Sequence, residues 1–180
     1  GLTNFDSANF NGDAFADIIV GSFNENKAYV IPGRDSWPPA TQTIYDLQNT
    51  GDLDTLGVTT IEVNDAIAGA NFGRNTAGIG DVISGGGSGT YGEVAIAMDT
   101  NPAQVVLIPG REATGAQTIT ISSNGGSTAD DDTVVRLKSH SGADNFGTDT
   151  LNGDHDLTGD GVADVVVDHF KSVPFVGIMI

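Results

Sequence analysis

Residues 9–17 read Asn-Phe-Asn-Gly-Asp-Ala-Phe-Ala-Asp and run directly into an apolar stretch at 18–21. Residues 156–164 read Asp-Leu-Thr-Gly-Asp-Gly-Val-Ala-Asp and run into the apolar stretch at 165–167. Both stretches carry an oxygen-bearing side chain at positions 1, 3, 5 and 9. Alternate residues of a tight loop can point inward, so these four groups and the carbonyl at position 7 can surround one hard cation. Calcium accepts about six to eight oxygens in flexible geometry, whereas magnesium demands a stricter octahedron, so the pattern favours calcium.

The chain repeats itself at a long period. Asn71-Phe72-Gly73 recurs as Asn145-Phe146-Gly147, and the Ile-Pro-Gly-Arg of 31–34 recurs at 108–111. These pairs, and the Gln-Thr-Ile of 42–44 and 117–119, are spaced by 74 to 77 residues. The two loops lie about two periods apart, which predicts a degenerate copy between them.

That intermediate copy opens at Gly80-Asp81-Val82 and closes at Tyr91-Gly92-Glu93. A Gly/Ser-rich insert at 84–89 stands where the middle ligands would be. We therefore expect this second loop to bind a cation weakly or not at all.

The apolar runs are short, β-branched and alternating, and none shows sustained helical spacing. The 25 glycines suit tight turns between short strands. We expect an exposed loop at 123–132 and a single all-β repeat domain over residues 1–180. Its repeats cover about 1–70, about 71–143 and, as a partial third, about 144–180. The expected strands are 17–20, 28–31, 42–46 and 59–63 in the first repeat, 93–98, 104–108, 117–122 and 133–137 in the second, and 163–168 and 175–180 in the third.

A repeat of four short strands is too small to bury its own faces and is typical of a propeller blade. The order of the motifs, with Phe72-Gly73 before Asp81 and Phe146-Gly147 before Asp156, resembles the FG-GAP repeat. That family builds the β-propeller of integrin α subunits and of related bacterial extracellular proteins. The resemblance implies blades of four antiparallel strands, here two full blades and a partial third.

The resemblance also implies which residues bind Ca2+. The ligands of the first loop would be Asn9, Asn11, Asp13, Phe15 and Asp17, and those of the last loop would be Asp156, Thr158, Asp160, Val162 and Asp164. Phe15 and Val162 would each contribute a backbone carbonyl. The phenylalanines beside the loops, Phe5, Phe10, Phe72 and Phe146, are expected to be core wedges between blades.

Two and a half blades do not close a propeller, which typically has about four to eight. The last strand, from Phe175 to Ile180, would leave an apolar edge open, and such an edge favours pairing with another chain. The chain is then either a fragment of a longer propeller or a subunit completed by its neighbour. In the second case copies associate head to tail by strand addition into rings or filaments. A sandwich or distorted barrel is the remaining alternative.

The composition excludes several classes of partner and of chemistry. A net charge of −17 disfavours binding to nucleic acid and to anionic membranes. There is no cysteine, so disulfides and thiolate chemistry are excluded, and no apolar run is long enough to predict insertion into a membrane. Calcium at extracellular concentrations can stabilise a fold in place of disulfides. We therefore expect an extracellular or cell-surface location.

Two functions fit these features. The first is a calcium-stabilised structural or adhesive module, which would self-assemble into a fibre. The alternative is a glycan- or protein-binding module of a larger secreted protein, in which Trp37 of Asp35-Ser36-Trp37-Pro38-Pro39 contacts the ligand. We expect Trp37 rather to cover the top of a blade or to fill a gap between blades. No constellation of catalytic residues stands apart from the ligand carboxylates, so we do not expect an enzyme.

Overall fold

The computed structural model describes residues 5–37, 44–64, 69–83, 91–126, 128–140 and 145–170, which form three β-sheets with one short α-helix. The first sheet contains β1 (Phe5–Ala8), β2 (Asp17–Ser22), β3 (Lys27–Ile31), β4 (Thr59–Val63) and β8 (Gln117–Ile121), in that order. The second contains β5 (Thr76–Gly80), β6 (Glu93–Met98), β7 (Gln104–Ile108) and β9 (Val135–Lys138). The third pairs β10 (Asn145–His155) with β11 (Asp164–Phe170). The prediction of an all-β fold is confirmed.

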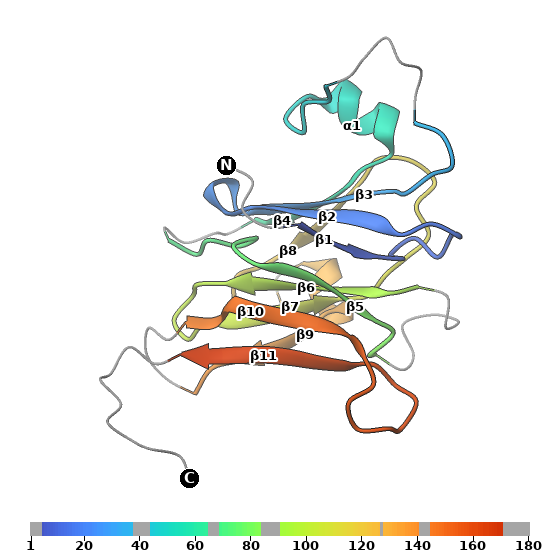
Figure 1. Ribbon diagram of the computed structural model, residues 1–180. Coiled ribbons are helices and arrows are strands. Elements are labelled where there is room, and N and C mark those ends of the chain that lie inside the picture. Colours follow the sequence, from blue (N-terminus) through green and yellow to red (C-terminus); the bar gives the residue numbers. More distant parts are fainter. Residues whose placement is uncertain are drawn as a thin grey trace.

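The three sheets stack as layers, with the second sheet in the middle (Figure 1). Alternate residues of β6 point to opposite faces, as the period of two in a strand requires. Val94, Ile96 and Met98 join the apolar cluster shared with the first sheet. Ala95 and Ala97 join the cluster shared with the third sheet. The strands β6 and β7 of the middle sheet are therefore buried on both faces, which explains why they read as nearly continuous apolar runs.

The Phe-Gly pairs lie between the layers. Phe72 is fully buried in the cluster between the first and second sheets, and Phe146 packs into the cluster between the second and third. Gly73 has a φ of 88°, and a Cβ there would stand 2.3 Å from the carbonyl oxygen of Lys27. Only glycine allows this close approach of a connecting segment to the first sheet. Phe10 is also a buried wedge, as expected, while the side chain of Phe5 lies outside the description.

A helix that the sequence pattern did not predict follows β3. It is α1 (Thr50–Leu56), seven residues long, and it covers the face of the first sheet that points away from the second (Figure 1). The Asn49 side chain accepts hydrogen bonds from the N–H groups of Gly51 and Asp52, and Gly57 ends the helix with a φ of 65°. Among the described residues, no helix is long and apolar enough to cross a membrane.

The predicted strands need correction in three respects. Ile44 to Asp46 form no strand, and residues 42 and 43 lie outside the described part of the chain, as do 175–180. The predicted strand at 117–122 exists as β8, but it pairs in parallel with β4 of the first sheet, so that sheet is not a four-stranded antiparallel blade. Three strands were missed, namely β1, β5 and β10, each of which forms a hairpin with the strand that follows it.

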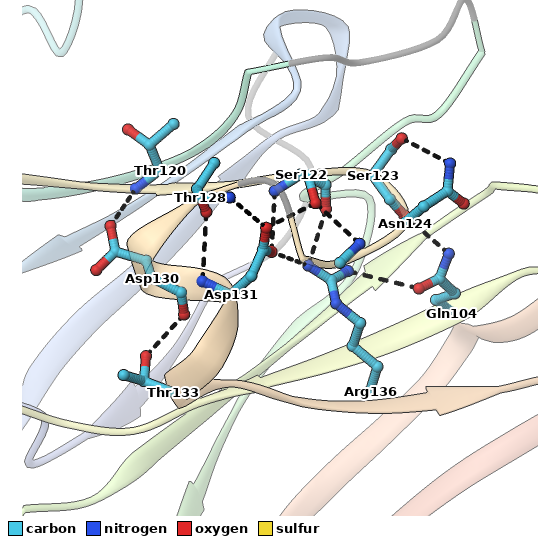
Figure 2. A network of polar contacts seen from close by, with 11 residues as sticks. Gln104, Thr120, Ser122, Ser123, Asn124, Thr128, Asp130, Asp131, Thr133 and Arg136 are labelled. Carbon is cyan, nitrogen blue, oxygen red and sulfur yellow. Dashed lines mark hydrogen bonds and ion pairs between the residues drawn. The ribbon is translucent and has the colours of Figure 1, made fainter.

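The predicted exposed loop at 123–132 is exposed at 124–126 and 129, but a buried ion pair of Asp131 ties it into the core (Figure 2). Arg136 of β9 donates to Asp131 at 2.7 Å, and the two side chains are only 10% and 1% exposed. Asp131 lies in the 3-10 turn η2 (Ala129–Thr133) and also accepts from the hydroxyl of Ser122, just beyond β8, at 2.7 Å. Arg136 further donates to the carbonyl of Ser122 at 2.8 Å. This network fastens β8 of the first sheet to β9 of the second.

We expect Asp131→Ala to lower the free energy of unfolding by about 3–5 kcal/mol, because it leaves the Arg136 charge buried without its partner. Urea unfolding followed by circular dichroism would measure the loss. The adjacent Asp130→Ala is the matched control, since its ion pair with Arg111 is 28% and 31% exposed. That variant should lose about 1 kcal/mol or less. Equal losses in the two variants would contradict a special role for the buried pair.

Candidate calcium-binding loops

Each sheet begins with a hairpin that closes in the same register. Ala8 pairs with Asp17 in the first sheet, Gly80 with Glu93 in the second, and His155 with Asp164 in the third. In every case an acidic residue is the first residue of the hairpin's second strand. The acidic position 9 of the two sequence loops thus corresponds to one structural position that recurs three times.

In the first loop the acid closes the turn by binding backbone N–H groups. Asp17 is fully buried. Its Oδ2 accepts from the N–H of Phe10 at 2.8 Å and of Asn11 at 3.2 Å. Its Oδ1 accepts from the N–H of Gly33 at 2.8 Å. Burial raises the pKa of Asp17, while these three hydrogen bonds act in the opposite direction.

The other polar side chains of the first loop bond to one another and to the loop's own backbone. The Asn9 amide donates to the carbonyl of Asp13 at 2.6 Å. The Asn11 amide donates to Asp13 Oδ2 at 2.8 Å, and Asn11 Oδ1 accepts from the Asp13 N–H at 3.0 Å. Asp13 Oδ1 accepts from the N–H of Phe15 at 2.6 Å. All five predicted ligand residues of this loop therefore lie in one small turn.

The first loop also joins two sheets. The carbonyl of Asn9 accepts from the N–H of Gly92 at 2.6 Å, and the carbonyl of Phe10 accepts from the N–H of Arg111 at 2.9 Å. A Cβ on Gly110 would stand 2.4 Å from the carbonyl oxygen of Gly92 and 2.5 Å from that of Phe10. The repeated Ile-Pro-Gly-Arg motif thus supplies a glycine where the backbones of the two sheets meet at this loop.

The last loop repeats the closing hydrogen bonds but is exposed. Asp164 Oδ2 accepts from the N–H groups of Leu157 at 2.7 Å and Thr158 at 3.0 Å. Asp156, at position 1, accepts from the N–H groups of Gly159 at 2.6 Å, Asp160 at 3.2 Å and Gly161 at 2.8 Å. These backbone donors, that of Gly161 first, lower the pKa of Asp156 and favour its charged form. Asp160 Oδ1 accepts from the N–H of Val162 at 2.9 Å.

The second loop keeps the closing acid although its middle ligands are missing from the sequence. Glu93 is 1% exposed, and its Oε2 accepts from the N–H of Val82 at 2.6 Å. Burial, as the largest cause, raises its pKa. Residues 84–90 lie outside the described part of the chain.

The oxygen atoms of the first loop are of the kind that calcium accepts. Asn9 Oδ1 is buried and has no hydrogen-bond partner, which costs free energy unless some other group satisfies it. Within the described ranges no three acidic or histidine side chains converge as a ready cage for a metal ion. The first loop would rely on two amides, two carboxylates and a carbonyl, all of which are oxygen ligands that calcium accepts. In the last loop Asp156 is turned toward backbone N–H groups.

A second cluster of polar and aromatic residues lies around Trp37; the sequence pattern singled out Trp37 but not the residues that surround it. Trp37 is 50% exposed, so it does not fill a gap between sheets. It borders a pocket that also includes Glu25, Tyr45 and Gln48. Asn49 and Gly57 are typical helix-capping residues, so they could have indicated the helix beside this pocket. The pocket itself could not be predicted, because its residues come from separate segments between 20 and 56 and share no sequence pattern.

No protein-family model matches the sequence, and no curated protein matches it either. The resemblance to the FG-GAP repeat therefore depends on the motifs of the chain itself.

We expect the stability of the protein to fall as the pH rises from the ordinary glutamate pKa of 4.5 to the higher pKa of folded Glu93. In this range the unfolded chain has already released the proton that the folded chain still holds, so rising pH favours unfolding. Asp17 acts in the same direction, starting from 3.8. Glu93→Gln should flatten part of this dependence in urea unfolding with chelator present. Glu112 is exposed, so Glu112→Gln is the control and should leave the pH dependence of stability unchanged. If Glu93→Gln also leaves it unchanged, Glu93 is not the source of this pH dependence.

Proposed function

We propose that this chain is a calcium-stabilised structural or adhesive module that works outside the cell or at its surface. Its three sheets would be blades of a propeller-like stack, with calcium bound in the first and last hairpin loops. The observation that carries the proposal is the first loop, where Asn9 and Asn11 both bond to Asp13 and Asn9 Oδ1 is buried without a hydrogen-bond partner. Calcium there would hold the junction of two sheets and would perform no chemistry.

The arrangement of the sheets supports the propeller-like interpretation. Apart from β8, the strands of the three sheets follow one another in chain order, and each sheet starts with a hairpin closed by an acid. The loops at 9–16 and 156–163 emerge at the same end of the stack, on the right in Figure 1. Such repetition is expected where each repeat buries its faces only against its neighbours.

An exposed sheet edge supports self-association. In the first sheet, β8 of the following repeat covers the outer edge of β4. In the second sheet, β9 takes the place of β4 and is the edge strand among the described residues. An edge strand offers free N–H and C=O groups to a strand from another chain. A second copy adding a strand here would extend the stack head to tail. The edge near Phe175 and Ile180 lies outside the described residues.

We expect Asp13→Ala to lower the melting temperature in calcium by roughly 5–10 °C, because a ligand present at about 100 times its Kd contributes about 2.7 kcal/mol to folding. With chelator the same variant should lose only a degree or two, from its loop hydrogen bonds. Differential scanning calorimetry would measure both. Asp54→Ala, in the exposed face of α1, is the control and should show no calcium-dependent loss. If Asp13→Ala loses as much in chelator as in calcium, the loop is not a calcium site.

We expect copies of the protein to associate in calcium and to separate in chelator, because the first loop fixes the sheets whose edge would receive the added strand. Sedimentation velocity would reveal species larger than the 18.4 kDa monomer, and negative-stain electron microscopy would show rings or filaments. A single monomeric species in both conditions at all concentrations would rule out assembly by this chain alone.

A further inference from the structure

The outer face of the first sheet carries a pocket that the calcium loops do not explain. It has a volume of about 520 Å³, within the range of small-molecule sites. Its walls come from β2, β3, the 3-10 turn η1 (Phe23–Glu25) and the segment at 45–48 before α1. Tyr29, Leu56 and Val58 form a buried apolar cluster beneath it, with Tyr45 and Leu47 packed against that cluster. The pocket therefore has an apolar floor and walls formed by two strands, a 3-10 turn and the segment before α1.

The polar groups of the pocket are held in place before any ligand arrives. Glu25 Oε2 accepts from the hydroxyl of Tyr29 at 3.1 Å, and Glu25 Oε1 accepts from the amide of Gln48. Asp46 Oδ1 accepts from the N–H of Gln48 at 2.9 Å, and the Asp46 N–H donates to Asp52 at 2.8 Å. Burial and the contact with Glu25 raise the pKa of Tyr29 to about 12, so its phenol stays neutral and keeps donating.

The aromatic wall is also fixed. The Arg34 guanidinium lies over the ring of Trp37, with its Cζ 5.2 Å from the ring centroid. The same guanidinium donates to the carbonyl of Leu56 at 2.5 Å and to that of Pro32 at 3.3 Å. Arg34 thus connects Trp37 to the end of α1, while the indole remains half exposed beside the pocket.

These groups select among classes of ligand. An anionic ligand is disfavoured, because Glu25 and Asp46 border the pocket, Arg34 is already engaged, and Lys27 beside it is paired with Glu62 at 3.3 Å. A cation stacked on Trp37 is disfavoured, because the Arg34 guanidinium already lies over that ring and would repel it. A wholly apolar ligand would leave the carboxylates and amide without water. A neutral ligand with both apolar faces and hydroxyl groups satisfies the aromatic and the polar wall together.

We propose that this pocket binds a neutral glycan chain, with a sugar ring stacked against Trp37 and its hydroxyl groups bonded to Glu25, Asp46 and Gln48. A second hollow of about 380 Å³ adjoins the first and shares Glu25, Tyr29, Leu47 and Gln48 with it. The Glu25–Gln48 pair thus stands between two hollows, so a ligand longer than one ring can contact it from both sides. No candidate calcium ligand lines either hollow, so this proposal does not depend on the calcium loops.

Trp37 is the only tryptophan, so its fluorescence reports this pocket directly. The probes are neutral hexasaccharides: cellohexaose, maltohexaose, xylohexaose, mannohexaose, laminarihexaose and chitohexaose. We expect a saturable change in fluorescence with at least one of them, at a Kd of about 1 mM or tighter. Gln48→Ala should weaken that Kd about tenfold, the effect of about 1.4 kcal/mol for a lost polar contact. Val166→Ala, on the exposed face of β11, is the control and should bind as the parent does. Circular dichroism would establish that both variants are folded.

Calorimetry of Trp37→Phe with the same sugar provides a second readout that does not use the fluorophore. Its affinity should also fall about tenfold or more, as expected for a lost stacking surface. Binding unchanged in both Gln48→Ala and Trp37→Phe would place the sugar elsewhere and overturn the proposal. A panel with no saturable response would also overturn it. A response to tetramethylammonium chloride but to no sugar would overturn it and would indicate a cation as the occupant. A fluorescence change that depends on protein concentration alone would overturn it and would indicate a second copy of the chain.

Discussion

The burial of β6 and β7, in the middle sheet, on both faces is the constraint on which the rest of the structure depends. These two strands must be apolar at successive residues, and Val105 and Val106 of β7 accordingly face different neighbouring sheets. Fully burying a side chain of this size contributes about 1.5–3 kcal/mol, so neither neighbouring sheet can be removed without a large loss. The outer sheets have no such requirement on their far sides. That freedom lets the first sheet carry α1 and a pocket, and it leaves the last hairpin exposed.

The closing acids show how position in the stack changes the same local motif. Asp17 and Glu93 are buried because the first two sheets pack over their hairpins, and burial raises both pKa values. Asp164 makes the same hydrogen bonds to positions 2 and 3 of its loop but is only partly buried. A buried carboxylate near an unpartnered amide oxygen gains more from a cation than an exposed one does, because it has lost more of its hydration. We therefore regard the first loop as the stronger of the two calcium candidates.

The hairpin loops could be found from the sequence because their residues are adjacent and their spacing is regular. The all-β class followed from the same local signals. The parallel pairing of β8 with β4 could not be found in that way, because Gln117–Ile121 is far from Thr59–Val63 in the chain and the local pattern of a strand does not name its partner. The Asp131–Arg136 pair was missed for a related reason. Three adjacent aspartates in a sequence look like a solvated turn, and only the structure shows that Thr128 and the arginine of the next strand both bond to Asp131.

The segment between the third and fourth strands of the first repeat explains why the proposed glycan pocket lies on the first sheet. In the first repeat this segment follows β3, contributes Trp37 and Gln48, and forms α1 over the sheet. In the second repeat it follows β7, crosses to the first sheet as β8, and returns through η2 to β9. The strands before and after this segment are equivalent in the two repeats, so the repeats differ in the connecting segment. Binding residues are commonly found in such connections, which a rigid scaffold holds in place. A chain whose repeats keep their strands and loops while this connection diverges can combine a shared structural role with a binding site confined to one repeat.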